Sequence, residues 1–236
     1  MTGNMLFAVL PQNERQRIAP FCETVTIEAH TVLCTPDELV PYAYFPQSGV
    51  CSAIVHARSG EAVEVGLIGH EGMVGLPLVL GESTNPFEIL VQVPGTATRI
   101  PRELFIEEAL RPGHSFCDAL LKYANLYLAT VAQTAVCNRV HQIQQRLARW
   151  LLEMHDRAER DDLPMTHEIL GMMLGAYRPS ITNALKALQA RGLLRVSRGR
   201  VTITDPDGLK LEACECHERI RRRTAATFRE IRRLAA

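Results

Sequence analysis

The sequence predicts an α+β protein, with an antiparallel β-roll or jelly roll in its first half and helices in its second half. Between residues 21 and 100, short β-rich runs such as CSAIVH, EAVEVGLI and FEILVQVPGTATRI alternate with turn signals such as RSG and GESTNP. Apolar residues fall at alternate positions of FEILVQV, which predicts a half-buried strand with Glu88 and Gln92 on its outer face. After Pro101 the composition becomes helical, so sheet and helix follow one another along the chain.

The composition is that of a folded protein without membrane segments. The chain has 236 residues, of which 47% are hydrophobic, so it can bury a sizeable core in one large or two smaller domains. It contains no run of about 18 apolar residues, and no basic region precedes the short apolar patch near its start. We therefore expect neither a membrane span nor a signal peptide, and we expect a cytoplasmic location.

The cysteines do not form a disulfide framework. The 7 cysteines are odd in number and mostly far apart, which agrees with a reducing compartment. Only the segment CECH, residues 214–217, brings thiols and an imidazole together. A zinc site usually has two separated ligand pairs, whereas a single residue separates Cys214 from Cys216 and no second pair is obvious. The sequence therefore predicts no metal and no cofactor, and it leaves the role of Cys214, Cys216 and His217 open.

Charge is distributed unevenly along the chain. Residues 1–137 hold 7 Lys and Arg against 14 Asp and Glu, whereas residues 138–236 hold 19 against 12. A basic half favours binding to phosphate backbones, and an acidic half is typical of a separate sensing or partner-binding module. Solvated arginine faces would give the same distribution, so charge alone does not decide the function.

A long helix is expected after the turn signal RPG at residues 111–113, because no Gly or Pro follows before Pro164. Side chains at alternating four- and three-residue steps form one seam on it, made by Phe116, Leu120, Tyr123, Tyr127, Thr130 and Thr134. An adjacent apolar face holds Leu121, Ala124, Leu128 and Ala135. We predict that the first seam is a homodimer interface; the alternative is a helix buried in the core of a monomer. A break is expected near Asn138 and Arg139.

The segment MTHEILGMMLGAYRPSITNALKALQ has the pattern of two short helices joined by a tight turn. Thr166 can cap the first helix, and Gly171 lets the second helix cross it closely. Gly175 can adopt the positive φ of the turn, and Pro179 suits the first turn of the second helix. This spacing is typical of a helix-turn-helix, in which two helices pack at a steep angle.

The residues that follow predict a wing. In RGLLRVSRGRVTITD, Gly192 ends the helix and two short β runs flank SRGR, where Gly199 allows a tight hairpin. Arg198 and Arg200 at the hairpin tip are expected to meet DNA phosphates. The whole pattern is that of a winged helix-turn-helix.

The second helix of the motif is expected to lie in the major groove of double-stranded DNA. Its DNA-binding residues would be Arg178, Pro179, Ser180, Thr182, Asn183 and Lys186. Arg pairs bidentately with guanine and Asn with adenine, so Arg178 and Asn183 are the expected base readers. The other polar side chains could instead hold phosphates.

These residues resemble the Crp/Fnr family of bacterial transcription regulators, most sharply in GMMLGAYRPSITNALKALQARGLL and GRVTITD. The resemblance implies a cyclic-nucleotide-binding-like effector domain over residues 1–112, a dimerisation helix over 113–138 and a DNA-binding domain over 139–236. It also implies a homodimer on a palindromic operator, with RNA polymerase as a further partner.

The residues that bind ligand in the cyclic-nucleotide members of that family are only partly present in this sequence. Its cyclic-nucleotide members have a phosphate cassette, in which a Gly-Glu turn is followed by Arg, because the cyclic phosphate needs a cation and backbone donors. The corresponding residues here are Gly72, Met73, Val74, Gly75 and Leu76. Met73 replaces the expected Glu, and no basic residue follows before Arg99. We therefore expect a degenerate effector pocket that does not bind cyclic AMP or cyclic GMP, and the small-molecule effector stays unknown.

Other functions stay open as alternatives. The same fold could respond to a cyclic nucleotide after all, or to haem through one of four histidines: His30, His56, His70 or His114. An iron–sulfur sensor is not expected, because no cysteine precedes Cys22. A nucleotide-processing enzyme is disfavoured, since HEG at residues 70–72 lacks the second His of a zinc hydrolase motif and no Gly-x-x-x-x-Gly-Lys loop exists. We therefore expect no enzymatic activity.

Overall fold

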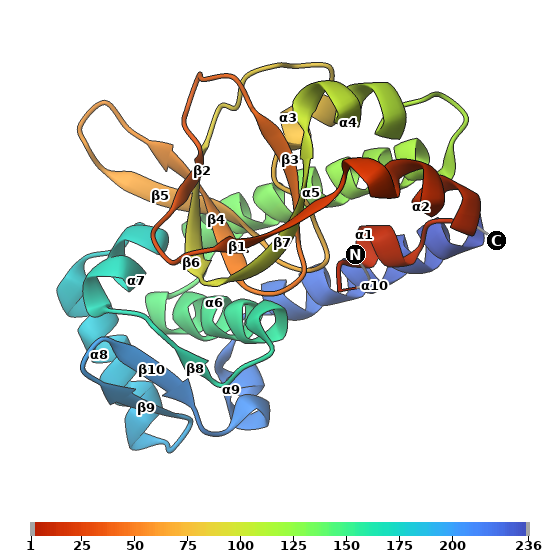
Figure 1. Cartoon of the computed structure of the whole chain (residues 1–236). Helices are drawn as coiled ribbons and strands as arrows, with labels where there is room; N and C mark the ends of the chain where they lie inside the picture. Colours follow the sequence, from red (N-terminus) through yellow and green to blue (C-terminus); the bar gives the residue numbers. More distant parts are fainter. Residues whose placement is uncertain (1–2, 235–236) are drawn as a thin grey trace.

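Two antiparallel sheets form a β-roll in the first half of the chain (Figure 1). The computed structural model describes residues 3–234. One sheet has the strand order β1-β7-β3 and the other has the order β2-β6-β4-β5. The strands are β1 (Glu23–Ile27), β2 (Val32–Cys34), β3 (Tyr42–Pro46), β4 (Val50–His56), β5 (Ala62–Ile68), β6 (Glu88–Val93) and β7 (Gly95–Pro101). The β-rich runs of the sequence thus form β4 to β7, and the predicted β-roll is confirmed.

Short helices flank the roll. They are α1 (Met5–Ala8), α2 (Gln12–Ile18), η1 (Ala19–Phe21), α3 (Leu76–Val79) and α4 (Arg102–Ala109). An aromatic cluster joins α1 and β3 to the long helix that follows, with the ring centroid of Phe45 lying 4.6 Å from that of Phe7 and 5.9 Å from that of Phe116. All three rings are fully buried, so this cluster fixes the long helix on the roll.

The long helix α5 (Ser115–Val140) is continuous over 26 residues. Its N-terminus is capped by Glu14, whose carboxylate accepts hydrogen bonds of 2.9 Å from the N–H groups of Ser115 and Phe116. A carboxylate is favourable there because the positive end of the helix dipole faces it. The contact ties α5 to α2 at the start of the sequence.

The second half begins with α6 (Ile143–Ala158). The break expected near Asn138 and Arg139 lies slightly further on, at His141 and Gln142, which are extended. The elements after α6 are β8 (Asp162–Leu163), α7 (His167–Met173), α8 (Arg178–Ala190), β9 (Leu194–Ser197), β10 (Arg200–Ile203) and α9 (Pro206–Glu212). The strands form an antiparallel sheet of order β8-β10-β9, so the predicted winged helix-turn-helix is confirmed.

The two halves share a hydrophobic core, in which the outer face of β4, β5 and β6 packs against α6 and α7. Gln92 was expected on the outer, solvated face of its strand. It is buried instead, and its Nε2 donates to Met173 Sδ at 3.4 Å. That expectation was wrong because α7 of the second half covers this face of the sheet.

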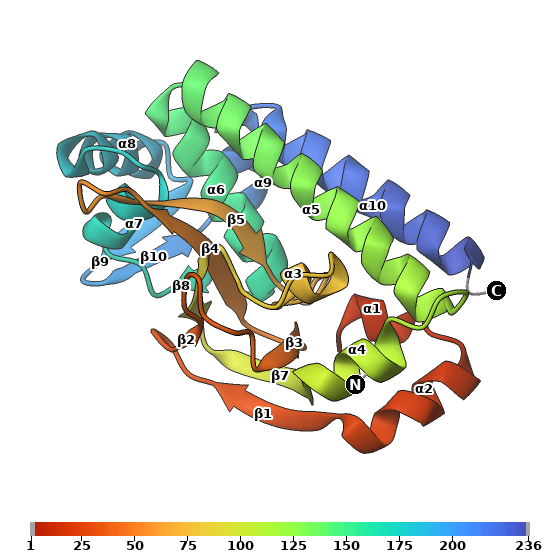
Figure 2. The same ribbon diagram turned by 90° about the horizontal axis from the view of Figure 1, so that it is seen from above.

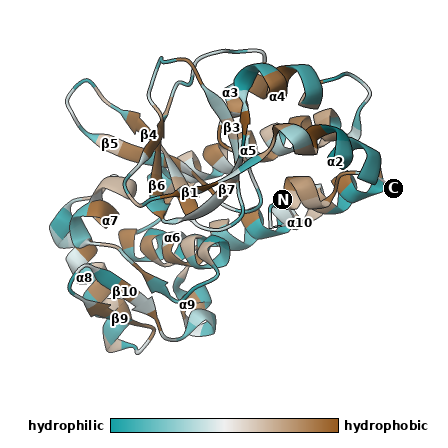
Figure 3. Ribbon diagram, in the orientation of Figure 1, coloured by the Kyte–Doolittle hydropathy of each residue, from teal (hydrophilic) through white to brown (hydrophobic). Residues whose placement is uncertain are grey.

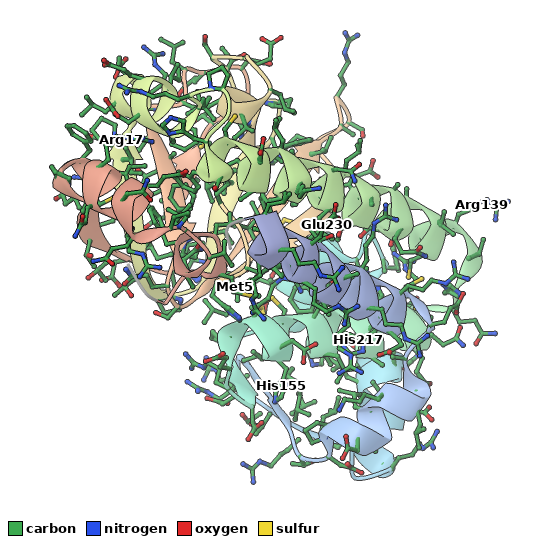
Figure 4. The ribbon with its side chains drawn as sticks, turned by 90° about the vertical axis from the view of Figure 1, so that its right-hand side faces the viewer. Met5, Arg17, Arg139, His155, His217 and Glu230 are labelled. Carbon is green, nitrogen blue, oxygen red and sulfur yellow. The ribbon has the colours of Figure 1, made fainter. Side chains whose placement is uncertain are left out.

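The last helix, α10 (Cys216–Leu234), leaves the winged helix-turn-helix and runs back alongside α5 (Figure 2). Phe228 and Ile231 belong to the core of the first half. Lys122 of α5 donates to Glu230 at 2.6 Å, and Figure 4 shows Glu230 between the two helices. This helix lies within residues 139–236, the predicted DNA-binding domain, whereas its apolar side chains pack on α5 and the first half of the chain.

The distribution of hydrophobic residues agrees with this arrangement of buried strands and outer helices. In Figure 3 the strands β4 and β5 carry hydrophobic residues, whereas α2 on the outside is mostly hydrophilic. Within residues 3–234, no helix combines the length and the apolar character that crossing a membrane requires.

Candidate nucleic-acid interface and effector cavity

The turn between α7 and α8 has the local structure that its residues predict. Thr166 caps α7, because its Oγ1 accepts a hydrogen bond from the N–H of Ile169 at 3.1 Å. Gly175 has a φ of +53°. A Cβ atom on Gly171 would lie 3.1 Å from the carbonyl oxygen of Ala176, which leaves little room for a side chain. These features fix the angle at which α8 leaves α7.

The outer side of α8 is polar and solvent-exposed. Arg178, Asn183 and Lys186 are exposed, as is Pro179 in the first turn, whereas Ser180 is half-buried. Within residues 3–234, the side chains of Arg178 and Lys186 form no ion pair. The helix therefore presents free cationic and amide groups on one surface, as a DNA-reading helix must.

Thr182 differs from its expected role. Its hydroxyl donates to the carbonyl oxygen of Arg178 at 3.1 Å and lies 3.0 Å from Nδ1 of His167 on α7. A contact between Thr182 and a phosphate would therefore compete with these two contacts within the motif. It joins the two helices of the motif, and His167 is the partner that the sequence pattern did not reveal.

Tyr177 is a further residue that the sequence analysis missed. It is the N-cap residue of α8, and 81% of its surface is exposed. Its ring is therefore accessible at the start of the helix that is expected to contact DNA. Its place in the sequence could have identified it, because it stands directly between the turn at Gly175 and Arg178, the first residue expected to read bases.

Of the two arginines expected to meet phosphates at the wing tip, one is free and the other is paired. Arg198 and Gly199 form the tip of the β9–β10 hairpin, where Gly199 has a φ of +71°. Arg198 is exposed and is in no ion pair among residues 3–234. Arg200, by contrast, forms an ion pair with Asp162 of β8. Its expected contact with phosphate therefore competes with a bond that holds the wing to its own sheet.

A cavity of about 650 Å³ lies between the β-roll and α5. The residues that line it are Asp37, Ile68, Met73, Gly75, Leu76, Pro77, Leu80, Glu82, Thr84, Asn85, Pro86, Phe87, Ile89, Leu121, Ala124, Asn125, Tyr127, Leu128 and Val131. Within the described chain, no Lys, Arg or His borders this cavity, so it offers carboxylates and apolar groups but no cation. None of the four histidines considered as haem ligands lines it.

The cavity contains three of the five residues expected in an effector pocket, namely Met73, Gly75 and Leu76. Gly72 instead packs against α5, where an added Cβ would lie 2.1 Å from Tyr123 Oη. Val74 is buried, and its backbone forms hydrogen bonds with that of Tyr44 on β3. These two residues hold the loop in place behind the cavity wall.

The expected dimer seam on α5 lies inside the protomer. All six of its residues are buried: Phe116, Leu120, Tyr123, Tyr127, Thr130 and Thr134. The prediction for these side chains was wrong, because the β-roll and α10 cover that side of α5. The adjacent face is open instead, since Leu121 is 47% exposed, Leu128 is 67% exposed and Ala135 is exposed.

A buried carboxylate links the two halves. Glu64 on β5 accepts a hydrogen bond of 2.6 Å from Ser52 Oγ and one of 2.8 Å from Trp150 Nε1 on α6. Burial raises the pKa of Glu64 to about 7, although both hydrogen bonds lower it in part. Close by, the guanidinium of Arg157 on α6 donates to Glu71 at 2.7 Å. The effector half and the DNA-binding half are therefore joined by polar contacts as well as by apolar packing.

Two family models match the chain. Residues 24–111 match a cyclic nucleotide-binding domain, and residues 145–212 match a Crp-like helix-turn-helix domain. The first range contains all seven strands of the β-roll except the first residue of β1, and the second contains α7, α8 and the wing. No curated protein matches the chain.

Solved structures share its fold. A protein from Eubacterium rectale, assigned to the Crp/Fnr family of transcriptional regulators, aligns with a TM-score of 0.70 at 19% identity, over 90% of this chain and 99% of that chain. FixK2 from Bradyrhizobium japonicum aligns with a TM-score of 0.69 at 16% identity, over 82% and 98%. A Crp/Fnr-family regulator from Thermus thermophilus aligns with a TM-score of 0.65 at 21% identity, over 81% and 98%. With both domain models matched in this order on one fold, the chain belongs to the Crp/Fnr family of transcription regulators.

Proposed function

We propose that the protein is a homodimeric, sequence-specific DNA-binding transcription regulator without enzymatic activity. The observation that carries the proposal is the group of exposed, unpaired cations around the start of α8 and the wing tip, formed by Arg178, Lys186 and Arg198. Unpaired cations on one surface attract a phosphate backbone and release its counterions. The excess of basic residues in the second half of the chain adds to this attraction.

Base reading falls to the N-terminal turns of α8. A recognition helix presents this end to base edges in the major groove. Arg178 suits guanine and Asn183 suits adenine, because each side chain can form two parallel hydrogen bonds to that base. Tyr177 and Lys186 would contact the backbone beside them. Thr182 has no direct role in this scheme, because its hydroxyl is engaged within the motif.

The dimer forms through the open face of α5. Leu121, Leu128 and Ala135 lie at seven-residue steps with the buried Ala124 between the two leucines, which is the spacing of a coiled-coil seam. Two copies of α5 packed along this face would remove exposed leucine side chains from water. A twofold dimer would place two α8 helices on half-sites about one helical turn apart, in a palindromic operator.

The effector is an uncharged or cationic small molecule with apolar groups. The cavity contains the side chains of Leu76, Leu80 and Phe87, and the acidic side chains that line it are the carboxylates of Asp37 and Glu82. A cyclic nucleotide would bring a phosphate charge without meeting a cation, which is costly. Leu121 and Leu128 line both the cavity and the proposed seam, so a bound ligand would change the surface on which the dimer forms.

The proposed division of the chain keeps three parts. Residues 1–112 sense the effector, residues 113–138 dimerise and residues 139–236 bind DNA, with α10 folded back on the dimerisation helix. A regulator of this kind works in the cytoplasm, where it meets DNA and RNA polymerase.

The test is recovery of genomic DNA fragments by the purified protein, with and without a small-molecule extract of the cells. We expect enrichment of fragments that share an inverted repeat, and binding by fluorescence anisotropy that is tighter for this repeat than for random duplex at every salt concentration. Equal affinity for both duplexes would contradict sequence-specific regulation.

A further inference from the structure

Four potential metal ligands from distant parts of the sequence meet at the junction of α5 and α10. They are Cys137, His141, Cys214 and Cys216, and their ligand atoms all lie within 4.8 Å of one another. Cys137 stands in the last turn of α5, and His141 follows one turn later, on the same side of the helix. The two other cysteines stand just before and at the start of α10.

The distances match those of tetrahedral coordination. Cys137 Sγ lies 3.5 Å from Cys214 Sγ, and Cys216 Sγ lies 3.6 Å from His141 Nδ1. In a tetrahedral zinc site, with Zn–S of about 2.3 Å and Zn–N of about 2.0–2.1 Å, neighbouring ligand atoms are roughly 3.5–3.8 Å apart. Two of the ligand–ligand distances therefore already have the length that one ion would impose, and all the others are within 4.8 Å.

A second layer of contacts orients these ligands. Glu215, which stands between the two cysteines of the CECH segment, approaches His141 Nε2 to 3.1 Å. It therefore leaves Nδ1 facing the sulfurs, in the carboxylate–histidine arrangement common to metal sites. On the other side, Gln133 Nε2 donates to Cys216 Sγ at 3.0 Å, as donors do to a metal-bound thiolate.

The three thiols are shielded from solvent. The three cysteines are buried together in a small cluster separate from the two main cores. Three thiolates bound to a divalent ion carry a smaller net negative charge than three free thiolates, so the ion lowers the cost of burying them.

We propose that Cys137, His141, Cys214 and Cys216 bind one Zn²⁺ ion, with three sulfurs and one nitrogen as ligands. On binding, the three thiols release their protons to solvent, and the ion takes their place. All four positions are supplied by the protein, so the site is structural and does no chemistry of its own. It fastens the end of α5, where the chain turns into the DNA-binding half, to the start of α10.

The CECH segment was not assigned to metal binding from the sequence because a second ligand pair was not recognised. That pair is Cys137 and His141, separated by three residues at the end of a helix. A Cys-x-x-x-His pair is a familiar half-site, but it lies more than seventy residues from its partner pair. Only the return of α10 along α5 brings the two pairs together.

The experiment uses the full chain, purified under reducing conditions and measured for metal by mass spectrometry. We expect one zinc per protomer, and we expect Co²⁺ substitution to give the intense sulfur-to-cobalt absorption and visible bands of a tetrahedral thiolate site. Cys214→Ser and His141→Ala should lose the ion. Cys117→Ser, which changes a half-buried cysteine elsewhere on α5, should retain it.

A competition titration with a coloured chelator then tests whether Glu215 strengthens zinc binding. Glu215→Gln should weaken zinc binding about 10–100-fold, whereas Glu218→Gln, one turn further along α10, should leave it unchanged. The proposal is overturned if the wild-type chain takes up no stoichiometric zinc, if Cys214→Ser binds it equally well, or if the purified wild-type chain holds a Cys137–Cys214 disulfide in place of the ion. Should a variant fail to fold, the cobalt spectrum of the wild-type chain decides alone.

Discussion

Trp150 Nε1 of α6 donates a hydrogen bond of 2.8 Å to the buried carboxylate of Glu64 on β5. This contact crosses from the DNA-binding half to the effector half of the chain. Because burial holds the pKa of Glu64 near 7, the charge at this contact changes within the range of ordinary cellular pH. The junction between the two halves of the chain therefore contains a titrating group.

The first prediction concerns stability against pH. The pKa of Glu64 in the folded chain is raised above the value of 4.5 that it has in the unfolded chain. The stability that the protonated carboxyl gives the folded chain is therefore fully present below pH 4.5 and is lost as the pH rises towards 7. We expect the free energy of unfolding of the wild-type chain to fall by about 3 kcal/mol relative to Glu64→Gln over this window. Urea unfolding of both chains at several pH values measures this difference in the free energy of unfolding. Glu61→Gln, on the exposed hairpin, is the control and should follow the wild type.

The second prediction assigns base reading to Asn183. Replacing Asn183 by Ala should relax the preference at one base pair in each half-site, at a cost of about 1–3 kcal/mol per half-site. Affinity for random DNA should hardly change, since the lost contact carries sequence information. Anisotropy titrations of the operator and of its single-base variants measure the effect. A uniform loss on operator and random DNA alike would show that Asn183 contacts the backbone.

The third prediction assigns phosphate binding to Arg198 at the wing tip. Arg198→Ala should weaken binding to all sequences alike and reduce the slope of log affinity against log salt by about 1. The control is Arg111→Ala, which removes a surface arginine at the end of α4, bound to Glu108. A change in sequence preference with an unchanged salt slope would contradict this role.

The fourth prediction tests the open face of α5. The double variant Leu121→Glu with Leu128→Glu would bury like charges against their mates in a dimer, at a cost of several kcal/mol. We expect it to be monomeric by light scattering and to keep its fold by circular dichroism. Leu211→Glu is a matched control, because Leu211 on α9 is 85% exposed and lies outside the seam. A double variant that stays dimeric would place the interface elsewhere.

The fifth prediction concerns the cavity. Cyclic AMP at millimolar concentration should change neither the melting temperature nor the affinity for DNA, since no cation within the described chain lines the cavity. A ligand that binds only the folded state stabilises it by about 2.7 kcal/mol at a hundredfold excess over its dissociation constant. Such a rise in melting temperature with cyclic AMP would mean that a cation enters the site, for instance from a second protomer.

Local features of this fold were predictable because neighbouring residues determine them. Thr166 caps its helix and Gly175 takes a positive φ for reasons contained within a few residues of sequence. The wing follows in the same way from Gly199 between two β-rich runs. The helix-turn-helix and the expected surface of α8 could therefore be derived before the tertiary structure was known.

The errors arose where a distant segment covers a surface. The pattern on α5 showed two apolar faces, but only the position of α10 and the β-roll decides that Tyr123 is buried and Leu128 is open. Gln92 was misplaced because α7 packs on its strand. Arg200 was counted as free because its partner, Asp162, lies on another strand of the sheet. Each of these contacts joins residues far apart in the sequence, so periodicity cannot reveal it.

The return of α10 to the first half has a consequence for synthesis on the ribosome. Phe228 and Ile231 complete a core whose other members precede residue 132. At about 5–20 residues per second, the chain needs on the order of ten seconds to extend from α5 to these side chains. During that interval the nascent effector half exposes the side of α5 that α10 later covers. Its final packing therefore waits for the end of translation, and a chain truncated before α10 would keep that apolar surface open to chaperones and proteases.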